Sequence, residues 1–151
     1  MNFKIQSAED AGIRAGEYHK MGYNCAESIF LTFRELLAPD VDEEFVRIAT
    51  PFGGGLGRAG CLCGALSGAV LMLGLAKGRI TYKVSRRESY ILSHGFEKKF
   101  KDKFGSTCCR ALNRNNFGTP QQAVVCMRII TEAAELFMEY IEQNSLAETE
   151  N

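Results

Sequence analysis

The sequence lacks an excess of charge of either sign, because 18 basic residues are balanced by 18 acidic ones. A neutral chain has no electrostatic footprint for nucleic acid or for an anionic membrane surface, so we expect neither as its main partner. The N-terminus lacks the basic-then-apolar order of a signal peptide, and the apolar stretch 62–76 is too short and too rich in glycine to span a membrane. These absences predict a cytoplasmic protein.

The familiar catalytic patterns are missing as well. The chain shows no Ser/His/Asp set, no paired-carboxylate site and no Walker sequence. Residues 55–60 (GLGRAG) match GxGxxG, but no convincing strand precedes them and no acidic residue follows at a second strand end, so we do not expect dinucleotide binding. The two histidines, His19 and His94, are isolated on polar segments and are typical of surface positions.

No part of the 151 residues has a linker-like composition, so we expect a single domain, 1–151, with a frayed tail from about residue 145. No segment alternates apolar and polar residues as a strand does. The pattern predicts an all-α fold, a single compact bundle of about seven helices around a buried, small-residue-rich central helix. The expected helices are 7–21, 24–37, 40–48, 62–77, 85–104, a short helical turn carrying residues 108–109, and 119–144.

The helix boundaries follow from capping signals. Residues 7–10, 24–27 and 85–88 each place a Ser or Asn three positions before an acidic residue, which is the order of a capping box. The segment 119–122 (TPQQ) combines an N-cap threonine with a proline at the first helical position. Gly22 is expected to end the first helix.

The stretch 51–77 (PFGGGLGRAGCLCGALSGAVLMLGLAK) joins a glycine-rich loop to a long apolar run. The run has no polar face, so we expect a helix buried on most sides. Gly60, Gly64 and Gly68 recur every four residues, in one row where neighbouring helices can approach closely. We therefore predict that this helix is central and contacts at least two others.

The chain has six cysteines, and in the cytoplasm such residues bind metals or take part in redox chemistry more often than they form structural disulfides. Cys25, Cys63 and Cys109 each fall in the first turn of a predicted helix, and Cys126 lies on the apolar stripe of the last one. A helix N-terminus carries positive potential, which stabilises a thiolate or a negatively charged metal–sulfur group. We therefore expect these four cysteines to converge on one site.

The other two cysteines, Cys61 and Cys108, are less well placed. They are either spectators, or Cys108 forms a strained vicinal disulfide with Cys109. No CxxCH or CxxCxxC run is present, so spacing along the chain specifies no metal. The competing interpretation of all six is that they are ordinary buried residues, because cysteine is among the most buried residue types.

The glycine-rich loop supplies the candidate cofactor-binding residues, Gly53, Gly54, Gly55 and Gly57. Glycine allows close approach of the backbone, so the loop can offer N–H groups to a cluster or to a small anion. Arg58 either serves the same end or is simply solvated.

With these residues the chain resembles a redox-active family named after its own cysteine pattern, C_GCAxxG_C_C. The resemblance covers about residues 11–139 and implies that the four family cysteines are Cys25, Cys63, Cys109 and Cys126. It also implies redox activity, with an iron–sulfur cluster in some relatives, and no known substrate. The matching segments are 23–27 (YNCAE), 52–57 (FGGGLG), 63–69 (CGALSGA), 109–112 (CRAL) and Cys126.

Two functions from different classes remain. In the first, the four cysteines hold an iron–sulfur cluster for electron transfer or cycle between thiol and disulfide, and a redox partner protein is expected. In the second, the chain is a non-catalytic helical module whose cysteines bind structural zinc or no metal. Zinc ligands usually come in close CxxC pairs, whereas these lie on four separate elements, which favours the first function. Either function is compatible with a homodimer.

Overall fold

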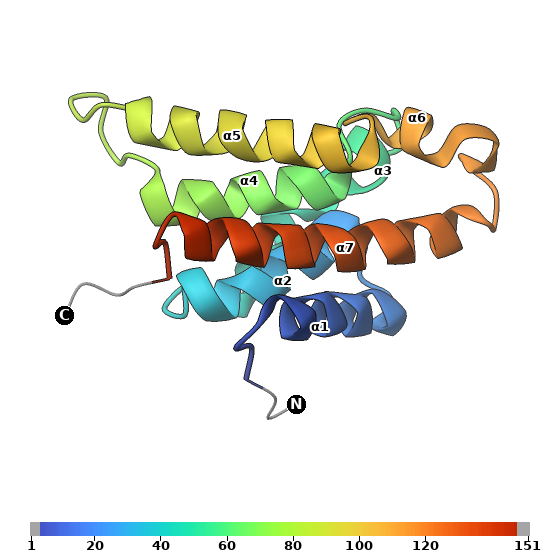
Figure 1. Ribbon diagram of the computed structural model, residues 1–151, viewed down its shortest axis with the longest axis horizontal. Coiled ribbons are helices and arrows are strands. Elements are labelled where there is room, and N and C mark those ends of the chain that lie inside the picture. The colour runs from blue at the N-terminus through green and yellow to red at the C-terminus, as the bar shows by residue number, and fades with distance from the viewer. Residues whose placement is uncertain (1–3, 148–151) are drawn as a thin grey trace.

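The computed structural model describes residues 4–147, and all regular secondary structure in that range is helical (Figure 1). This confirms the all-α fold class. The last residues of the predicted frayed tail, 148–151, lie outside the described range. In chain order the elements are α1 (Ala8–Met21), α2 (Cys25–Leu37), the 3₁₀ helices η1 (Glu43–Ile48) and η2 (Thr50–Phe52), the short α3 (Gly53–Leu56), α4 (Gly64–Lys77), α5 (Arg87–Phe104), α6 (Cys109–Asn113), η3 (Arg114–Asn116) and α7 (Gln122–Gln143).

The number of helices differs from the prediction. Between residues 4 and 147 six α-helices have regular dihedral angles, where the sequence predicts about seven, because the segment predicted as a helix over 40–48 is the 3₁₀ helix η1. Arg34 donates to the carbonyl of Val41 at 2.7 Å and holds the chain just before η1. Only six residues remain for the helix, and a segment this short readily adopts the tighter 3₁₀ form. The short α3 is not a seventh regular helix, since its inner glycines have positive φ.

Several predicted helix ends are confirmed. Asn24 accepts from the backbone N–H of Glu27, and the Glu27 carboxylate accepts from the N–H of Asn24, both at 2.9 Å, which completes a capping box at the start of α2. Ser7 caps α1, and Gly22 ends it in the left-handed conformation. Cys25 is consequently the first residue of α2.

Two predicted helix starts are wrong by two or three residues. Ser85 accepts from the N–H of Arg87 at 3.2 Å, and α5 begins only at Arg87 without a side-chain cap. The last helix begins at Gln122 rather than Thr119. The Thr119 hydroxyl donates to the carbonyl of Asn116, and the Gln122 side chain accepts from Gly118, so both capping groups stabilise a turn before the helix.

The sequence predicts a central position for α4, and the structure confirms it for the first part of the helix. It lies between α5 on one side and α2 and α7 on the other (Figure 1). Gly68 allows α2 to approach closely, because a Cβ on this residue would lie 2.8 Å from the carbonyl oxygen of Ala26. The last turn of α4 is open to solvent, with Leu75 42% exposed, so burial on most sides holds only for residues 64–73.

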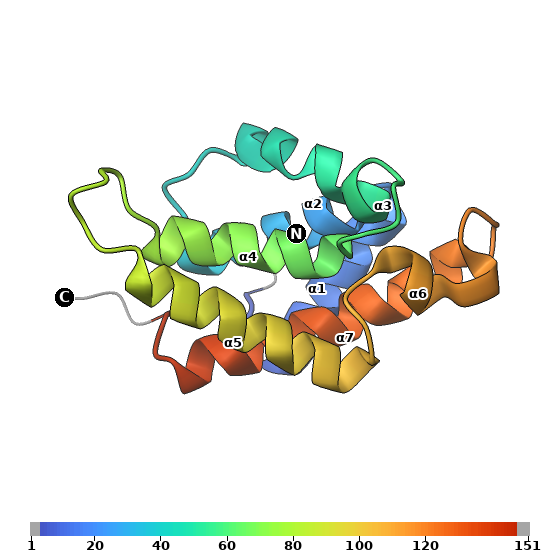
Figure 2. The same ribbon diagram turned by 90° about the horizontal axis from the view of Figure 1, so that it is seen from above.

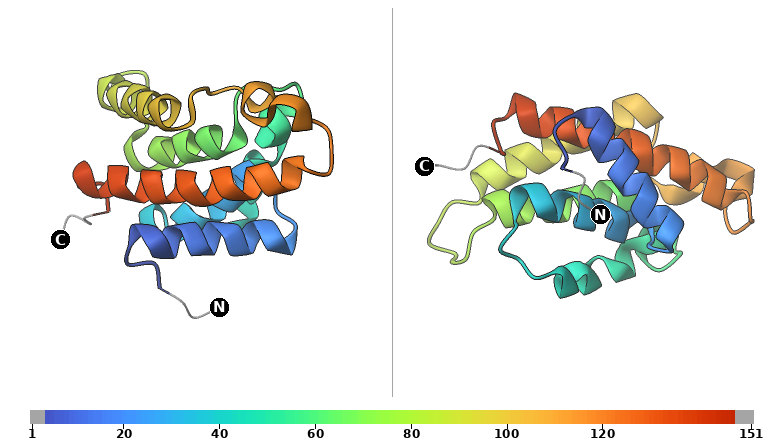
Figure 3. Two further views of the ribbon diagram at one scale, coloured as in Figure 1. Left: turned by 45° about the vertical axis from the view of Figure 1, so that its right-hand side comes forward. Right: turned by 90° about the horizontal axis from the view of Figure 1, so that it is seen from below.

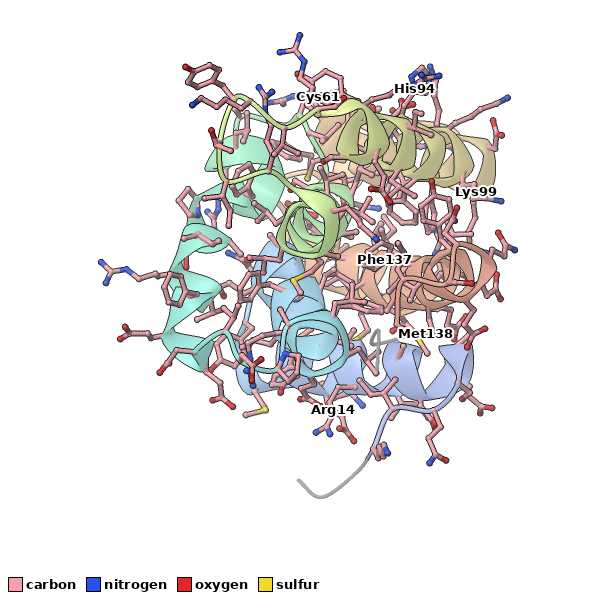
Figure 4. The ribbon with its side chains drawn as sticks, turned by 90° about the vertical axis from the view of Figure 1, so that its left-hand side faces the viewer. Arg14, Cys61, His94, Lys99, Phe137 and Met138 are labelled. Atoms are coloured by element: carbon pink, nitrogen blue, oxygen red, sulfur yellow. A yellow bond between two sulfur atoms is a disulfide. The ribbon has the colours of Figure 1, made fainter. Side chains whose placement is uncertain are left out.

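An aromatic cluster connects α2, α5 and α7 in the core of the bundle. Phe137 of α7 packs edge-on against Phe33 of α2 at 4.7 Å between ring centroids, and against Phe96 of α5 at 4.9 Å. The Tyr140 hydroxyl donates to the carbonyl of Leu92 at 2.8 Å and fastens α7 to α5. Figure 4 shows Phe137 in the middle of the bundle and Lys99 of α5 at its outer edge.

The helix starts that carry the predicted site lie together at one end of the bundle. Seen from above, α3 and α6 both lie beside the N-terminal end of α4 (Figure 2), and the side view in Figure 3 shows the same arrangement next to the start of α7. In the described range the structure contains no helix with the length and apolarity that a membrane span requires.

Candidate functional site

Four cysteines from four helices line a single cavity. Cys25 opens α2, Cys63 immediately precedes α4, Cys109 opens α6, and Cys126 lies about one turn into α7. These are the four residues that the sequence predicts to converge, and the structure brings all of them together. The cavity has a volume of about 20 Å³, room for roughly one water molecule. The remaining lining residues are Gly54, Asn113, Gln122, Ile129 and Ile130.

The four thiols differ in their access to solvent. Cys63 is 6% exposed and Cys109 is 3% exposed, whereas Cys25 and Cys126 are half-buried. The apolar side chains of Ile129 and Ile130 close the cavity from the α7 side. The site is therefore a mostly apolar pocket with two sulfurs inside and two nearer its edge.

Burial makes all four thiols weak acids. Loss of solvent raises the pKa of Cys63 and Cys25 above the ordinary thiol value, and it raises the pKa of Cys126 to about 11. The pKa of Cys109 is raised by the same cause. The other thiols of the site add to the effect, because a negative charge on Cys25 would disfavour a second one on Cys63, Cys109 or Cys126. Burial and the neighbouring thiols therefore both favour the protonated form of each free thiol.

Backbone N–H groups oppose this effect at two of the sulfurs. Burial is the larger influence on the pKa of Cys25, and the N–H groups of Gly54 and Gly64 lower it. At Cys63 the N–H group of Ala65, in the first turn of α4, acts in the same direction. These donors come from helix starts and from the glycine loop, as the sequence predicts.

Side-chain amides serve the other two sulfurs. Asn113 donates through Nδ2 to Cys109 Sγ at 3.6 Å, and Gln122 donates through Nε2 to the same atom at 3.7 Å. Both amides also lower the pKa of Cys126, against the larger effect of burial. Sequence reasoning missed these two residues. A usable signal was present, since Asn113 lies one helical turn after Cys109 and Gln122 one turn before Cys126.

The four predicted glycines have different positions. Gly54 lines the cavity, and its N–H group acts on Cys25. Gly55 is buried behind the cavity, where a Cβ would lie 3.0 Å from the Cβ of Cys109. Gly53 and Gly57 line a second, outer cleft instead. Of the four, Gly54 therefore has direct contact with the cysteine cavity, and a cofactor-binding role for the set stays a prediction.

The other two cysteines form a disulfide with each other, Cys61–Cys108, across a separation of 47 residues. The vicinal Cys108–Cys109 bond considered from the sequence is therefore wrong, and neither residue is an isolated spectator. The bond joins the loop before α4 to the residue before α6. The same two segments share backbone hydrogen bonds, from Cys63 N to Thr107 O at 2.8 Å and from Arg110 N to Gly60 O at 2.9 Å.

The donor set of the cavity fits an iron–sulfur cluster in kind and number, because such clusters are held by four cysteine thiolates and tuned by hydrogen bonds to sulfur. The cavity of about 20 Å³ is smaller than a cluster needs, so the cysteine side chains or the glycine loop would have to move outward to admit one. The cysteine side chains are not arranged to bind a single metal ion. Nowhere in residues 4–147 do three or more His, Cys, Asp or Glu side chains form a group that could hold one metal ion.

Comparisons with known proteins agree with the geometry. The family model described as "Putative redox-active protein (C_GCAxxG_C_C)" matches residues 23–140, a span that includes all four cysteines of the cavity. An uncharacterized protein of Archaeoglobus fulgidus is 30% identical over 141 residues, covering 87% of this chain and 93% of the relative. No solved structure matches the chain. The chain belongs to the C_GCAxxG_C_C family of redox-active proteins.

Proposed function

We propose that Cys25, Cys63, Cys109 and Cys126 hold an iron–sulfur cluster and that the protein transfers electrons through it. One observation carries the proposal: four cysteine side chains from four helices line one buried cavity, and N–H donors act on every sulfur. Membership of a redox-active family agrees with it.

The electrostatics of the cavity argue against freely reactive thiols. Reactive cysteines normally have a lowered pKa and are partly exposed, whereas these four have raised pKa values and two of them are nearly inaccessible. Metal binding removes the thiol protons outright. N–H donors aimed at sulfur then stabilise the negative charge that burial alone would disfavour.

The protein residues have separable roles in this proposal. The four cysteines are the ligands. Gly54 and Gly64 supply backbone N–H groups to the Cys25 side, and Asn113 and Gln122 supply amide groups to the Cys109 side. Ile129 and Ile130 exclude water. The cluster would supply reversible one-electron transfer, which requires an electron-exchanging partner protein.

Thiol–disulfide cycling is the second candidate, and the Cys61–Cys108 disulfide favours it, because an oxidised sulfur pair lies next to the site in the sequence. In this cycle two site thiols would lose two electrons and two protons to a disulfide oxidant as one S–S bond forms. Their raised pKa values make such an attack slow at neutral pH, so we rank this function below the cluster.

The test is anaerobic purification followed by an absorption spectrum and by analysis for iron, zinc and acid-labile sulfide. We expect visible charge-transfer absorption that bleaches on reduction, with iron and sulfide in similar amounts. Zinc without sulfide would support the structural-module alternative instead. Metal-free protein whose free thiol count rises by more than the two from Cys61–Cys108 on reduction would support thiol cycling.

A matched control separates the cavity from the neighbouring disulfide. Cys63→Ala removes one proposed ligand, and Cys61→Ser/Cys108→Ser removes two cysteines that lie outside the cavity. Iron should be lost from the first variant and kept by the second. If the second variant loses iron and the first keeps it, Cys61 and Cys108 are the ligands instead, and the assignment is refuted.

A further inference from the structure

An open cleft lies beside the four-cysteine cavity. Its volume is about 610 Å³, within the range that is typical of small-molecule sites. Cys25, Cys126 and Gly54 line both the cleft and the inner cavity, whereas Cys63 and Cys109 line only the cavity. The two more exposed thiols therefore form the boundary between the cleft and the buried site.

The lining of the cleft carries positive charge and no negative charge. Arg58 and His19 are its ionisable residues apart from the two cysteines, and no Asp or Glu is among the lining residues. Arg58 makes no ion pair with any residue between 4 and 147. His19, which the sequence places on the surface, donates from Nδ1 to the carbonyl of Tyr23 at 2.8 Å and is held at the cleft wall. Neutral residues from the turn before α7 complete the lining.

Arg58 lies in the glycine loop, next to the cysteine site. Arg58 has a φ of 69°, a left-handed value that an arginine adopts at a cost and that a glycine would adopt freely. Its side-chain stem lies against Gly54, where a Cβ would come within 2.8 Å of Arg58 Cγ. Because Gly54 in turn touches Cys25 through its N–H group, the guanidinium stem and the Cys25 thiol are separated by a single glycine.

We propose that this cleft binds a small anionic molecule, bearing a carboxylate or an inorganic oxyanion group, which Arg58 holds against Cys25 and Cys126. Arginine binds both kinds of anion through paired N–H donors, and a cleft without carboxylates does not repel them. The ligand would lie at the open edge of the site, next to Cys25 and Cys126. Binding itself does not require that the cavity holds a cluster.

The experiment is calorimetric titration of the purified protein with three probes, which are sodium phosphate, sodium sulfate and sodium succinate. The variant Arg58→Gln removes the cleft cation. Lys99→Gln removes the same unit charge from the exposed face of α5, which does not line the cleft. We expect at least one probe to bind the wild type and Lys99→Gln equally, and to bind Arg58→Gln about 10- to 100-fold more weakly, as loss of a charge-assisted contact predicts. Phosphate or sulfate binding indicates an oxyanion ligand, and succinate binding a carboxylate.

A second variant tests the location. Ala123→Phe places a ring in the cleft from the α7 side and leaves every charge in place. It should weaken binding of the same probe. In reduced, metal-free wild type the bound probe should slow alkylation of Cys25 and Cys126 by neutral iodoacetamide. Equal binding to wild type and Arg58→Gln, no binding of any probe, or normal binding to Ala123→Phe would each overturn the proposal.

Failure of the anion-binding proposal can be distinguished from failure of the cluster proposal. Iron and sulfide are measured on the same wild-type and Arg58→Gln preparations. Normal iron in both, with weakened anion binding in Arg58→Gln, supports the cleft as a separate feature. Absent iron in both, with Arg58-dependent anion binding, refutes the cluster and supports the cleft.

Discussion

The aromatic core of the bundle and its cysteine end are built in opposite ways. In the aromatic core, large rings from three helices interlock, with Phe33, Phe96 and Phe137 all fully buried. At the cysteine end, glycines, small thiols and helix starts surround a cavity, and Leu56, Arg58 and Arg114 have positive φ. The first arrangement removes apolar area from water, and the second keeps polar and strained groups close together.

The difference indicates a division of labour between stability and chemistry. Buried aromatic residues dominate the energetics of a core, because each removes about 150–250 Å² from water. Local strain and unsatisfied polar groups tend to cluster at functional sites and depend on the rest of the fold to hold them. Asn113 Oδ1 is such a group, since it is buried at the cysteine end without a hydrogen-bond partner in residues 4–147.

The largest expected effect is in the aromatic core. Phe137→Ala should lower the free energy of unfolding by about 3–5 kcal/mol, because it removes a ring that contacts two others and leaves a cavity. Urea denaturation measures the change. Iron bound per folded chain should stay the same, since Phe137 does not line the cysteine cavity. A loss below 1 kcal/mol, or a loss of iron from folded protein, would contradict the proposed division.

The next effect concerns the disulfide at the cysteine end. Replacing Cys61 and Cys108 by serine should lower the free energy of unfolding by about 2–4 kcal/mol, because the bond closes a long loop in the unfolded chain. The comparison is between oxidised wild type, reduced wild type and the double variant. The last two should agree with each other. If reduction leaves the urea midpoint of the wild type unchanged, the bond contributes no stability.

The central helix α4, which begins at the cysteine end, permits a paired test. Gly64→Leu and Gly68→Leu should each destabilise by about 1–3 kcal/mol through overpacking. Added atoms at Gly68 meet the backbone of Ala26, whereas those at Gly64 meet the sulfur of Cys25. Gly64→Leu should therefore also lose iron, and Gly68→Leu should keep it when folded. Equal iron contents in the two variants would show that Gly64 is not part of the site.

The smallest expected effect is the pH dependence of the metal-free, reduced protein. The folded pKa of Cys126 is about 11, above the ordinary value of 9.0 that applies to the unfolded chain. The unfolded state therefore releases its proton first, and the stability that this thiol contributes is complete below about pH 9 and is lost as the pH rises through about 11. Thermal unfolding between pH 7 and 11 measures the loss. The stability of Cys126→Ala should decline less steeply with pH than that of wild type. If the two declines are identical, groups other than Cys126 cause the loss.

Much of the cysteine end could be predicted because its signals are local. The capping box of Asn24 and Glu27 puts Cys25 at a helix start without reference to any other part of the chain. The apolar stripe of the last helix likewise places Cys126 toward the interior. Three of the cysteines lie at helix starts, where the positive potential stabilises a thiolate, and this shared property favours a common site. The structure confirms that all four cysteines line one cavity.

The features that were missed depend on tertiary placement. The Cys61–Cys108 bond forms because the loop before α4 runs beside the start of α6, a proximity that no spacing in the sequence encodes. The cleft of Arg58 exists for the same reason, since its walls come from the glycine loop and from the turn before α7. The contact of Arg34 in α2 with the carbonyl of Val41, just before η1, is likewise a feature that local spacing does not encode.

The central claim, that four cysteines act as one redox centre, is tested most directly by the iron retained per chain in single variants. Cys25→Ala, Cys63→Ala, Cys109→Ala and Cys126→Ala are purified anaerobically beside wild type and the Cys61→Ser/Cys108→Ser control. We predict visible cluster absorption in wild type and in the control, and its loss together with the iron in each of the four single variants. Full iron retained by any one of the four, or no iron in anaerobic wild type, would contradict the claim.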